Sequence, residues 1–254
     1  MTPTKLLLAT VLTFSFPATP SHADQRADFL SGRTRECARC DLAGENFKRR
    51  DLSDSDLTGA NLKGANLHDA KLAGAHLGGA NRSGSNLNKA DLRRADLVGA
   101  NLREAMMYGA NLDAAKLSRV DLTDALMGTA RMVGTELTRA VLRSVDLRKA
   151  RLADAILTDA DLTDAVLDFA FLRGARFDGA QLVEARLIGA ELIGASLVGA
   201  DLTDANALGA NCREADLTRA NLTQTNFHKG SLYEAKLDGA TFSDTTMPDG
   251  TMRP

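Results

Sequence analysis

Large apolar side chains recur at every fifth residue over most of this chain. The central apolar position falls on residue numbers that end in 2 or 7, from Leu42 to Met247, without an insertion or deletion. The residue two places earlier is small, and 31 of the 37 such positions from 60 to 240 are Ala. This pattern gives 42 consecutive pentads, and it determines the predicted architecture of the chain.

A period of five fits neither of the common regular structures. In an α-helix each residue turns about 100°, so side chains five residues apart drift around the axis. In a flat strand an odd period sends successive leucines to opposite faces. A chain that turns a corner every five residues can instead point each Leu and each Ala inward. Four such sides close a square coil of about 20 residues, and each coil buries its core only against its neighbours, as in solenoid proteins.

The repeated motif A-[D/N]-L-x-x, as in residues 60–64 (ANLKG), resembles the pentapeptide-repeat family over roughly 205 of the 254 residues. The resemblance implies an all-β fold, a right-handed, four-sided parallel β-helix of about 10 coils. It also implies that the central residue and the small residue two places before it face inward, for example Leu162 and Ala160. The position two after each Leu is often Gly or a polar residue, which suits a solvent-exposed corner.

Residues 1–23 have the pattern of a secretory signal peptide. Lys5 provides the positive charge, residues 6–16 form an apolar run, and small residues occupy the −3 and −1 places of 21–23, which predicts cleavage before Asp24. The apolar run is too short to span a bilayer, so we expect no membrane span after cleavage. The sequence therefore predicts a periplasmic or secreted protein, and the alternative is a cytosolic protein with an apolar N-terminal tail.

The pattern divides the rest of the chain into a cap segment at 24–40, the repeat array at 41–247 and a tail at 248–254. The cap contains Cys37 and Cys40 in a CxxC motif, which in an oxidising compartment most simply forms a disulfide. Free or metal-bound thiols and a catalytic dithiol are the alternatives. Redox-active CxxC motifs belong to βαβ settings, which this sequence lacks, and zinc would need two further ligands.

The rest of the sequence predicts no catalytic residue, cofactor site or metal site. Asp and Asn recur before the central Leu, where they can bond to local backbone, and no carboxylate pair differs from the many equivalent ones. The formal net charge is −2, with Lys and Arg spread through the array, so we do not expect nucleic acid to be the partner.

Departures from the repeat indicate where a partner could bind. Arg82 occupies a central position, and we expect either that its corner bulges so that it reaches water or that it marks a local break, with a binding role as the alternative. Ala207 and Cys212 are undersized central residues, and we expect Cys212 to be buried, reduced and inert. Outward apolar residues form the predicted interaction surface: Val183, Ile188, Ile193, Val198 and Leu208, which we call the girdle, and Met106, Leu126 and Val166 on one side of the rod.

The sequence favours a non-enzymatic scaffold or interaction module of the cell envelope, with a protein partner that it does not identify. Homodimerisation through the C-terminal coil or the girdle is a further expectation, because no terminal helix covers the last coil. The alternative function is DNA mimicry, since the resemblance includes proteins that bind DNA gyrase, although the balanced charge argues against it. An enzyme using the two cysteines is a third hypothesis. Interrupted threonine columns argue against ice binding.

Overall fold

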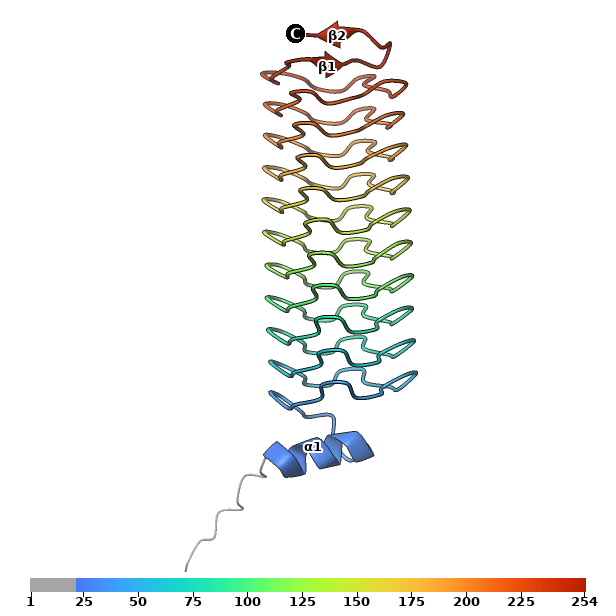
Figure 1. Cartoon of the computed structure of the whole chain (residues 1–254), viewed down its shortest axis with the longest axis vertical. Helices are drawn as coiled ribbons and strands as arrows, with labels where there is room; N and C mark the ends of the chain where they lie inside the picture. Colours follow the sequence, from blue (N-terminus) through green and yellow to red (C-terminus); the bar gives the residue numbers. More distant parts are fainter. Residues whose placement is uncertain (1–21) are drawn as a thin grey trace, which may run out of the picture.

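The computed structural model describes residues 22–254, and most of the predicted signal peptide lies outside these residues. Helix α1 spans His22–Ser31, strand β1 spans Thr245–Thr246 and strand β2 spans Met252–Arg253. Between them the chain forms a straight stack of four-sided coils, with α1 across one end and the two strands at the other (Figure 1).

Each side of each coil pairs with the same side of the next coil. The pairing consists of single parallel bridges, which run from Glu36 with Asp56 to Asn226 with Thr246. At one such bridge the N–H of Leu62 donates to the C=O of Asn81 (2.6 Å), and the N–H of Asn81 donates to the C=O of Ala60 (3.0 Å). Because every bridge joins residues that are four pentads apart in the sequence, the predicted length of the coil is confirmed.

Each corner is a tight turn closed by a backbone hydrogen bond, such as that from the N–H of Ala65 to the C=O of Leu62 (3.0 Å). The third residue of the turn has a positive φ, the feature that type II turns require. Gly64 adopts this conformation without steric cost (φ 63°), but Lys89 (φ 58°), Ala114 (φ 57°) and Phe169 (φ 57°) adopt it as well. Corner residues other than glycine thus also adopt the left-handed backbone conformation.

The interior of the rod is the predicted stack of central and small residues. Leu162 and Ala160 are fully buried, and so are their equivalents through most of the array. Ala207 and Cys212 are also buried, and burial raises the pKa of the Cys212 thiol to about 12. The expectation for Arg82 was wrong: its corner does not bulge, and the side chain is fully buried among the leucines. The hydrogen bonds of the neighbouring coils hold the backbone in register and keep this side chain inside.

Helix α1 closes the N-terminal end of the core. Phe29 of α1 is buried against Phe47 of the first coil, with ring centroids 5.9 Å apart in an edge-to-face arrangement. The guanidinium of Arg50 lies over both rings, 5.4 and 5.5 Å from their centroids. The predicted disulfide between Cys37 and Cys40 is present. Both cysteines are buried at the N-terminal end of the rod, the end that carries α1.

The C-terminal end is less completely closed. Strands β1 and β2 form an antiparallel hairpin, and the guanidinium of Arg253 lies 3.6 Å from the ring centroid of Phe242. The central residues of the last coil, Leu232, Leu237 and Phe242, remain partly exposed. The N–H groups of Leu232 and Leu237 donate no backbone hydrogen bond. The last coil therefore presents both apolar surface and unpaired backbone donors.

Candidate interaction surface

The girdle residues are half-buried and lie on four different sides of the rod. Val183, Ile188, Ile193 and Val198 come from successive sides of one coil, and Leu208 follows Ile188 on the same side of the next coil. None of them is among the exposed large apolar residues of the rod. The structure does not gather these residues into one patch, and their role as an interface stays a prediction.

Met106 and Leu126, in contrast, are neighbours on one side of the rod. Their backbones form one of the parallel bridges, and 37% of Met106 and 51% of Leu126 are exposed. Asp146 follows Leu126 on the same side and separates it from Val166, which is half-buried. Two of the three outward apolar residues predicted on this side therefore form a continuous exposed pair.

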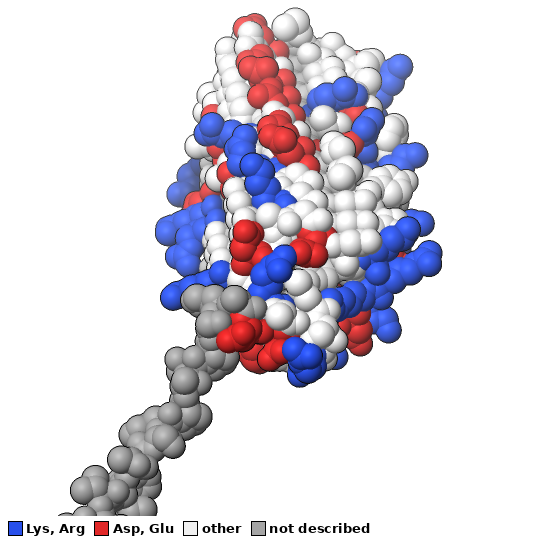
Figure 2. Space-filling model, turned by 60° about the horizontal axis from the view of Figure 1, so that its bottom comes forward, with Lys and Arg blue, Asp and Glu red and all other residues white. Residues whose placement is uncertain are grey.

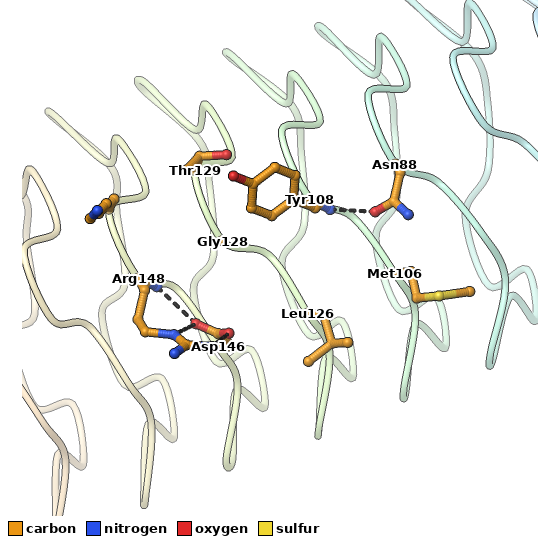
Figure 3. A pocket seen from close by; sticks show the side chains of 9 residues that line it. Asn88, Met106, Tyr108, Leu126, Gly128, Thr129, Asp146 and Arg148 are labelled. Atoms are coloured by element: carbon orange, nitrogen blue, oxygen red, sulfur yellow. Dashed lines mark hydrogen bonds and ion pairs between the residues drawn. The ribbon is translucent and has the colours of Figure 1, made fainter.

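Three exposed aromatic residues extend this pair, and sequence reasoning missed all of them. Tyr108 (56% exposed) projects beside Met106 and Leu126 and lies over Gly128 of the next coil (Figure 3). Phe169 and Phe171 are also more than half exposed, and they flank a corner two to three coils later. We call Met106, Tyr108, Leu126, Phe169 and Phe171 together the apolar flank. A sequence signal existed: Tyr108 and Phe169 each have a Gly at the equivalent position of the next coil, which leaves room for the ring.

The apolar flank borders two adjoining hollows. Met106, Tyr108 and Leu126 line a shallow groove of about 490 Å³, whose rim is polar. Lys149 lines this groove and also the second hollow, which Phe169 and Phe171 form (about 390 Å³). Because one lysine lines both, the two hollows are neighbours along the rod. The flank has the composition of a protein-binding surface, in which aromatic residues and Met are enriched.

The polar rim of the groove is held by internal hydrogen bonds. Arg148 donates from Nε to Oδ1 of Asp146 (2.9 Å), and the Arg148 N–H donates to the same oxygen (3.0 Å), as Figure 3 shows. The hydrogen bonds from Arg148 lower the pKa of the Asp146 carboxyl. Asn88 accepts a hydrogen bond from the N–H of Tyr108 (2.8 Å). These hydrogen bonds hold the polar side chains at the rim of the groove in place.

The side of the rod that precedes the apolar flank along the chain is acidic. It consists of the pentads that begin at 101 and at every twentieth residue to 241, and we call it the acidic side. These pentads contain nine Asp or Glu residues and two Arg residues. Figure 2 shows acidic side chains in a column along part of the rod, and the pentads 141–145 and 221–225 of the acidic side contain no Asp or Glu. Five of its exposed corner residues are Glu104, Asp124, Asp164, Glu184 and Asp204. The nearly balanced charge of the whole chain conceals this asymmetry.

The acidic column forms one border of the apolar flank. Glu104 lies two residues before Met106, and Asp124 lies two residues before Leu126, across the same corner of the coil. Behind this corner, partial burial raises the pKa of Asp121, but hydrogen bonds from Thr123 and Arg103 outweigh that effect and lower it overall. The Asp121 carboxyl is therefore ionised at neutral pH.

The structure brings no catalytic constellation together among residues 22–254. Cys37 and Cys40 are joined in a disulfide whose sulfur-bearing residues are at most 2% exposed, so a substrate has no direct access to them. In the described part of the chain no three His, Cys, Asp or Glu side chains are placed to hold a metal ion. None of its helices is both long and apolar enough to cross a bilayer.

The pentad array matches the family model of pentapeptide repeats in eight overlapping copies that cover residues 37–124 and 130–247. No curated protein matches the sequence. Among solved structures, the chain is similar to HetL, a pentapeptide repeat protein involved in heterocyst differentiation regulation from the cyanobacterium Nostoc sp. strain PCC 7120. The identity is 30%, the alignment covers 91% of this chain and 98% of HetL, and the TM-score is 0.64.

A second similar structure is QnrB1, a plasmid-mediated fluoroquinolone resistance protein. In its full-length form the identity is 19%, the coverage is 79% of this chain and 90% of QnrB1, and the TM-score is 0.55. At this identity the likeness shows the fold alone. Together these matches confirm the predicted fold class, a right-handed, four-sided parallel β-helix.

Proposed function

Because the chain belongs to the pentapeptide-repeat family, we propose that it is a non-enzymatic interaction module, which binds a protein partner through the apolar flank and its acidic border. The exposure of Tyr108, Phe169 and Phe171 carries this proposal. The coil requires apolar residues only at inward positions, so the fold does not explain large aromatic side chains that point outward. Exposed apolar patches with polar borders commonly mark protein contact sites.

The rod is well suited to present such a surface. Its sides are bonded to one another coil by coil through the backbone, and the core is filled along its length. A partner that docks on this surface therefore loses little free energy to ordering of the rod. The rigidity of the rod thus supports a binding role, because it keeps the outward side chains in fixed positions.

The acidic border indicates the chemistry of the partner. A carboxylate column beside an apolar groove favours a surface that places Lys or Arg next to apolar side chains. The same charges would speed the approach of a basic partner at low ionic strength. We therefore propose a partner with a basic, partly apolar surface.

Photocrosslinking tests this proposal. A photoreactive phenylalanine analogue would replace Leu126 of the apolar flank, and in a control it would replace Thr138, which lies outside the flank at the same level of the rod. We expect a specific crosslinked product from position 126 whose yield falls as salt is raised, and none from position 138. Equal products from both positions, or none from position 126, would contradict the assignment.

The proposed location is the periplasm or the exterior of the cell. The pattern of residues 1–23 supports it, and the Cys37–Cys40 disulfide fits an oxidising compartment. The intact mass of protein from separated fractions tests the location. A periplasmic mass that begins at Asp24, with the two thiols labelled only after reduction, is expected. A full-length cytoplasmic protein with free thiols at 37 and 40 would overturn it.

A second candidate function is mimicry of DNA toward DNA gyrase, and the acidic side favours it. The acidic column supplies, on one side of the rod, the negative surface that a basic groove would require. The net charge of the whole chain, −2, is too small to supply it. A supercoiling assay with purified gyrase tests it, using a triple variant Asp164→Asn, Glu184→Gln and Asp204→Asn. A control variant neutralises Asp154, Glu214 and Glu234, which are corner residues of another side. Inhibition lost only in the first variant would support mimicry, and no inhibition by the wild type would exclude it.

We also propose that two copies associate end to end through the last coil. Its partly exposed Leu232, Leu237 and Phe242 and its unpaired N–H groups supply apolar area and backbone donors at one place. An unpaired edge of this kind is a template for a second chain.

A further inference from the structure

Arg82 is a charged residue in the centre of an apolar core. It occupies a central position with Leu62 one coil before it and Leu102 one coil after it, and all three side chains are fully buried. Its Nη2 donates to the C=O of Leu77 (3.1 Å). Nε and Nη1 are buried and have no protein acceptor within hydrogen-bonding distance. A guanidinium carries only donors, so these two nitrogens require an acceptor.

The part of the chain that the structure describes supplies no buried counter-charge for this guanidinium. Among residues 22–254 the buried polar or charged side chains include a single carboxylate, Asp168, which pairs with Arg186 several coils away. Burial lowers the pKa of Arg82 to about 9, so the side chain is still protonated at pH 7. An unpaired charge in an apolar interior is strongly unfavourable. The described residues therefore leave the charge of Arg82 without a buried counter-ion.

Ser85 provides a third unused donor in the same coil, directly after the corner that follows Arg82. Buried threonines at this position of the pentad donate to a carbonyl of the preceding coil, as Thr225 does to the C=O of Leu202 (2.7 Å). Ser85 makes no such bond, and its Oγ has no protein partner although it is buried. The buried Ser55 is unpaired in the same way, but Ser85 is the serine that closes the turn beginning at Arg82, with its N–H donating to the C=O of Arg82 (3.0 Å). Its hydroxyl is thus free to bond to a guest within the core of this coil.

We propose that Arg82 and Ser85 form an internal site for one small monovalent anion of the halide class, enclosed when the coils close around it. Nε and Nη1 of Arg82 and Oγ of Ser85 would donate to the ion. A water molecule would satisfy the donors but would leave the positive charge uncompensated. The fully buried Leu and Ala side chains around Arg82 favour the smallest anions over a phosphate or an organic acid. The site is independent of the apolar flank.

Chloride-dependent unfolding tests the site in solution. The unfolding equilibrium would be measured in urea with sodium chloride and with sodium gluconate, whose anion is too large to enter, at constant ionic strength. Once chloride exceeds its dissociation constant, each tenfold increase should raise the ratio of folded to unfolded protein by about tenfold. The variant Arg82→Met should lose this dependence and should be at least as stable as the wild type in gluconate. Arg93→Met deletes an exposed guanidinium and should keep the dependence.

A bromide derivative tests the site directly, and it does not depend on whether Arg82→Met folds. Crystals grown in sodium bromide should show one anomalous peak between the Arg82 guanidinium and Ser85 Oγ. The peak should be weaker in Ser85→Ala. No peak at Arg82, an ordered water in its place, or a guanidinium turned toward solvent would overturn the proposal. Stability that is independent of chloride in the wild type would overturn it as well.

Discussion

The ring of Tyr108 lies against Gly128, the residue one coil later on the same side of the rod. A Cβ atom at position 128 would stand 3.2 Å from Cδ2 of the Tyr108 ring, closer than ordinary packing allows. Phe169 and Gly189 repeat the relationship, with a Cβ–ring distance of 2.7 Å. In each pair the aromatic ring occupies the space that a side chain at the glycine position would fill. The two glycines therefore hold exposed aromatic residues in fixed positions, as a binding surface requires.

Gly128→Val should displace the Tyr108 ring without unfolding the rod. Gly78 is a matched control, because it occupies the same position of its pentad and a Cβ there would meet only Val98 O, at 3.7 Å. The chain has two tyrosines and no tryptophan, so fluorescence in a Tyr233→Phe background reports on Tyr108 alone. Acrylamide should quench this fluorescence more in Gly128→Val than in Gly78→Val. Equal quenching in the two variants would show that the glycine does not seat the ring.

Ala114→Gly should stabilise the rod. Ala114 holds a left-handed backbone (φ 57°), which costs an L-residue roughly 1–2 kcal/mol. Glycine removes that cost but loses more backbone entropy on folding, so we expect a net gain of about 0.5–1 kcal/mol. Ala153→Gly is the control, because Ala153 lies outside the left-handed region and should lose about 0.5–1 kcal/mol. Urea unfolding measures both, and a loss of stability in Ala114→Gly would contradict the account of the corners.

Acid should remove the stabilisation that Arg148 gives to Asp146. Hydrogen bonding to Arg148 lowers the folded-state pKa of this carboxyl below its ordinary value of 3.8. Because the unfolded chain takes up the proton first, the stabilisation is complete above the ordinary pKa and is lost as the pH falls through the folded-state pKa. Arg148→Met should therefore be less stable than the wild type at pH 6, and the difference should shrink toward pH 3. A difference that stays constant between these pH values would contradict the linkage.

Leu237→Glu should prevent end-to-end association. The substitution places a charge on the partly exposed apolar surface of the last coil, where a second copy would have to bury it. Sedimentation should show a dimer for the wild type and a monomer for Leu237→Glu. The double variant Ile188→Lys and Ile193→Lys, in the girdle, should remain dimeric. If the girdle variant alone becomes monomeric, the association surface is the girdle and not the last coil.

The sequence was sufficient to predict the coil, because every pentad repeats the same constraint. An inward leucine and a small residue two places before it recur on every side of nearly every coil, and a single exception cannot change the register that its neighbours impose. For the same reason the expectation for Arg82 was wrong. Backbone hydrogen bonds on both sides kept its pentad regular, at the expense of burying a charge.

The outward surface was predicted less well. The exposure of an outward residue depends on the side chains one coil before and one coil after it. For this reason Ile188 is partly covered, whereas Leu126 is 51% exposed. Tyr108 and Phe169 stand out only when the glycine one coil later is considered with them. The acidic side was missed because charge was considered over the whole chain and not along one side of the rod.

The affinity of the crosslinked partner for two tyrosine variants shows whether the apolar flank is the surface that binds it. Tyr108→Ser removes a ring from the apolar flank, whereas Tyr233→Ser removes a ring of similar exposure near the C-terminal end, where it lies beside Arg213. If the flank is the binding surface, the dissociation constant should rise by about 30-fold in Tyr108→Ser, as for an aromatic hot spot, and should stay unchanged in Tyr233→Ser. Equal dissociation constants for the wild type and Tyr108→Ser would contradict the account.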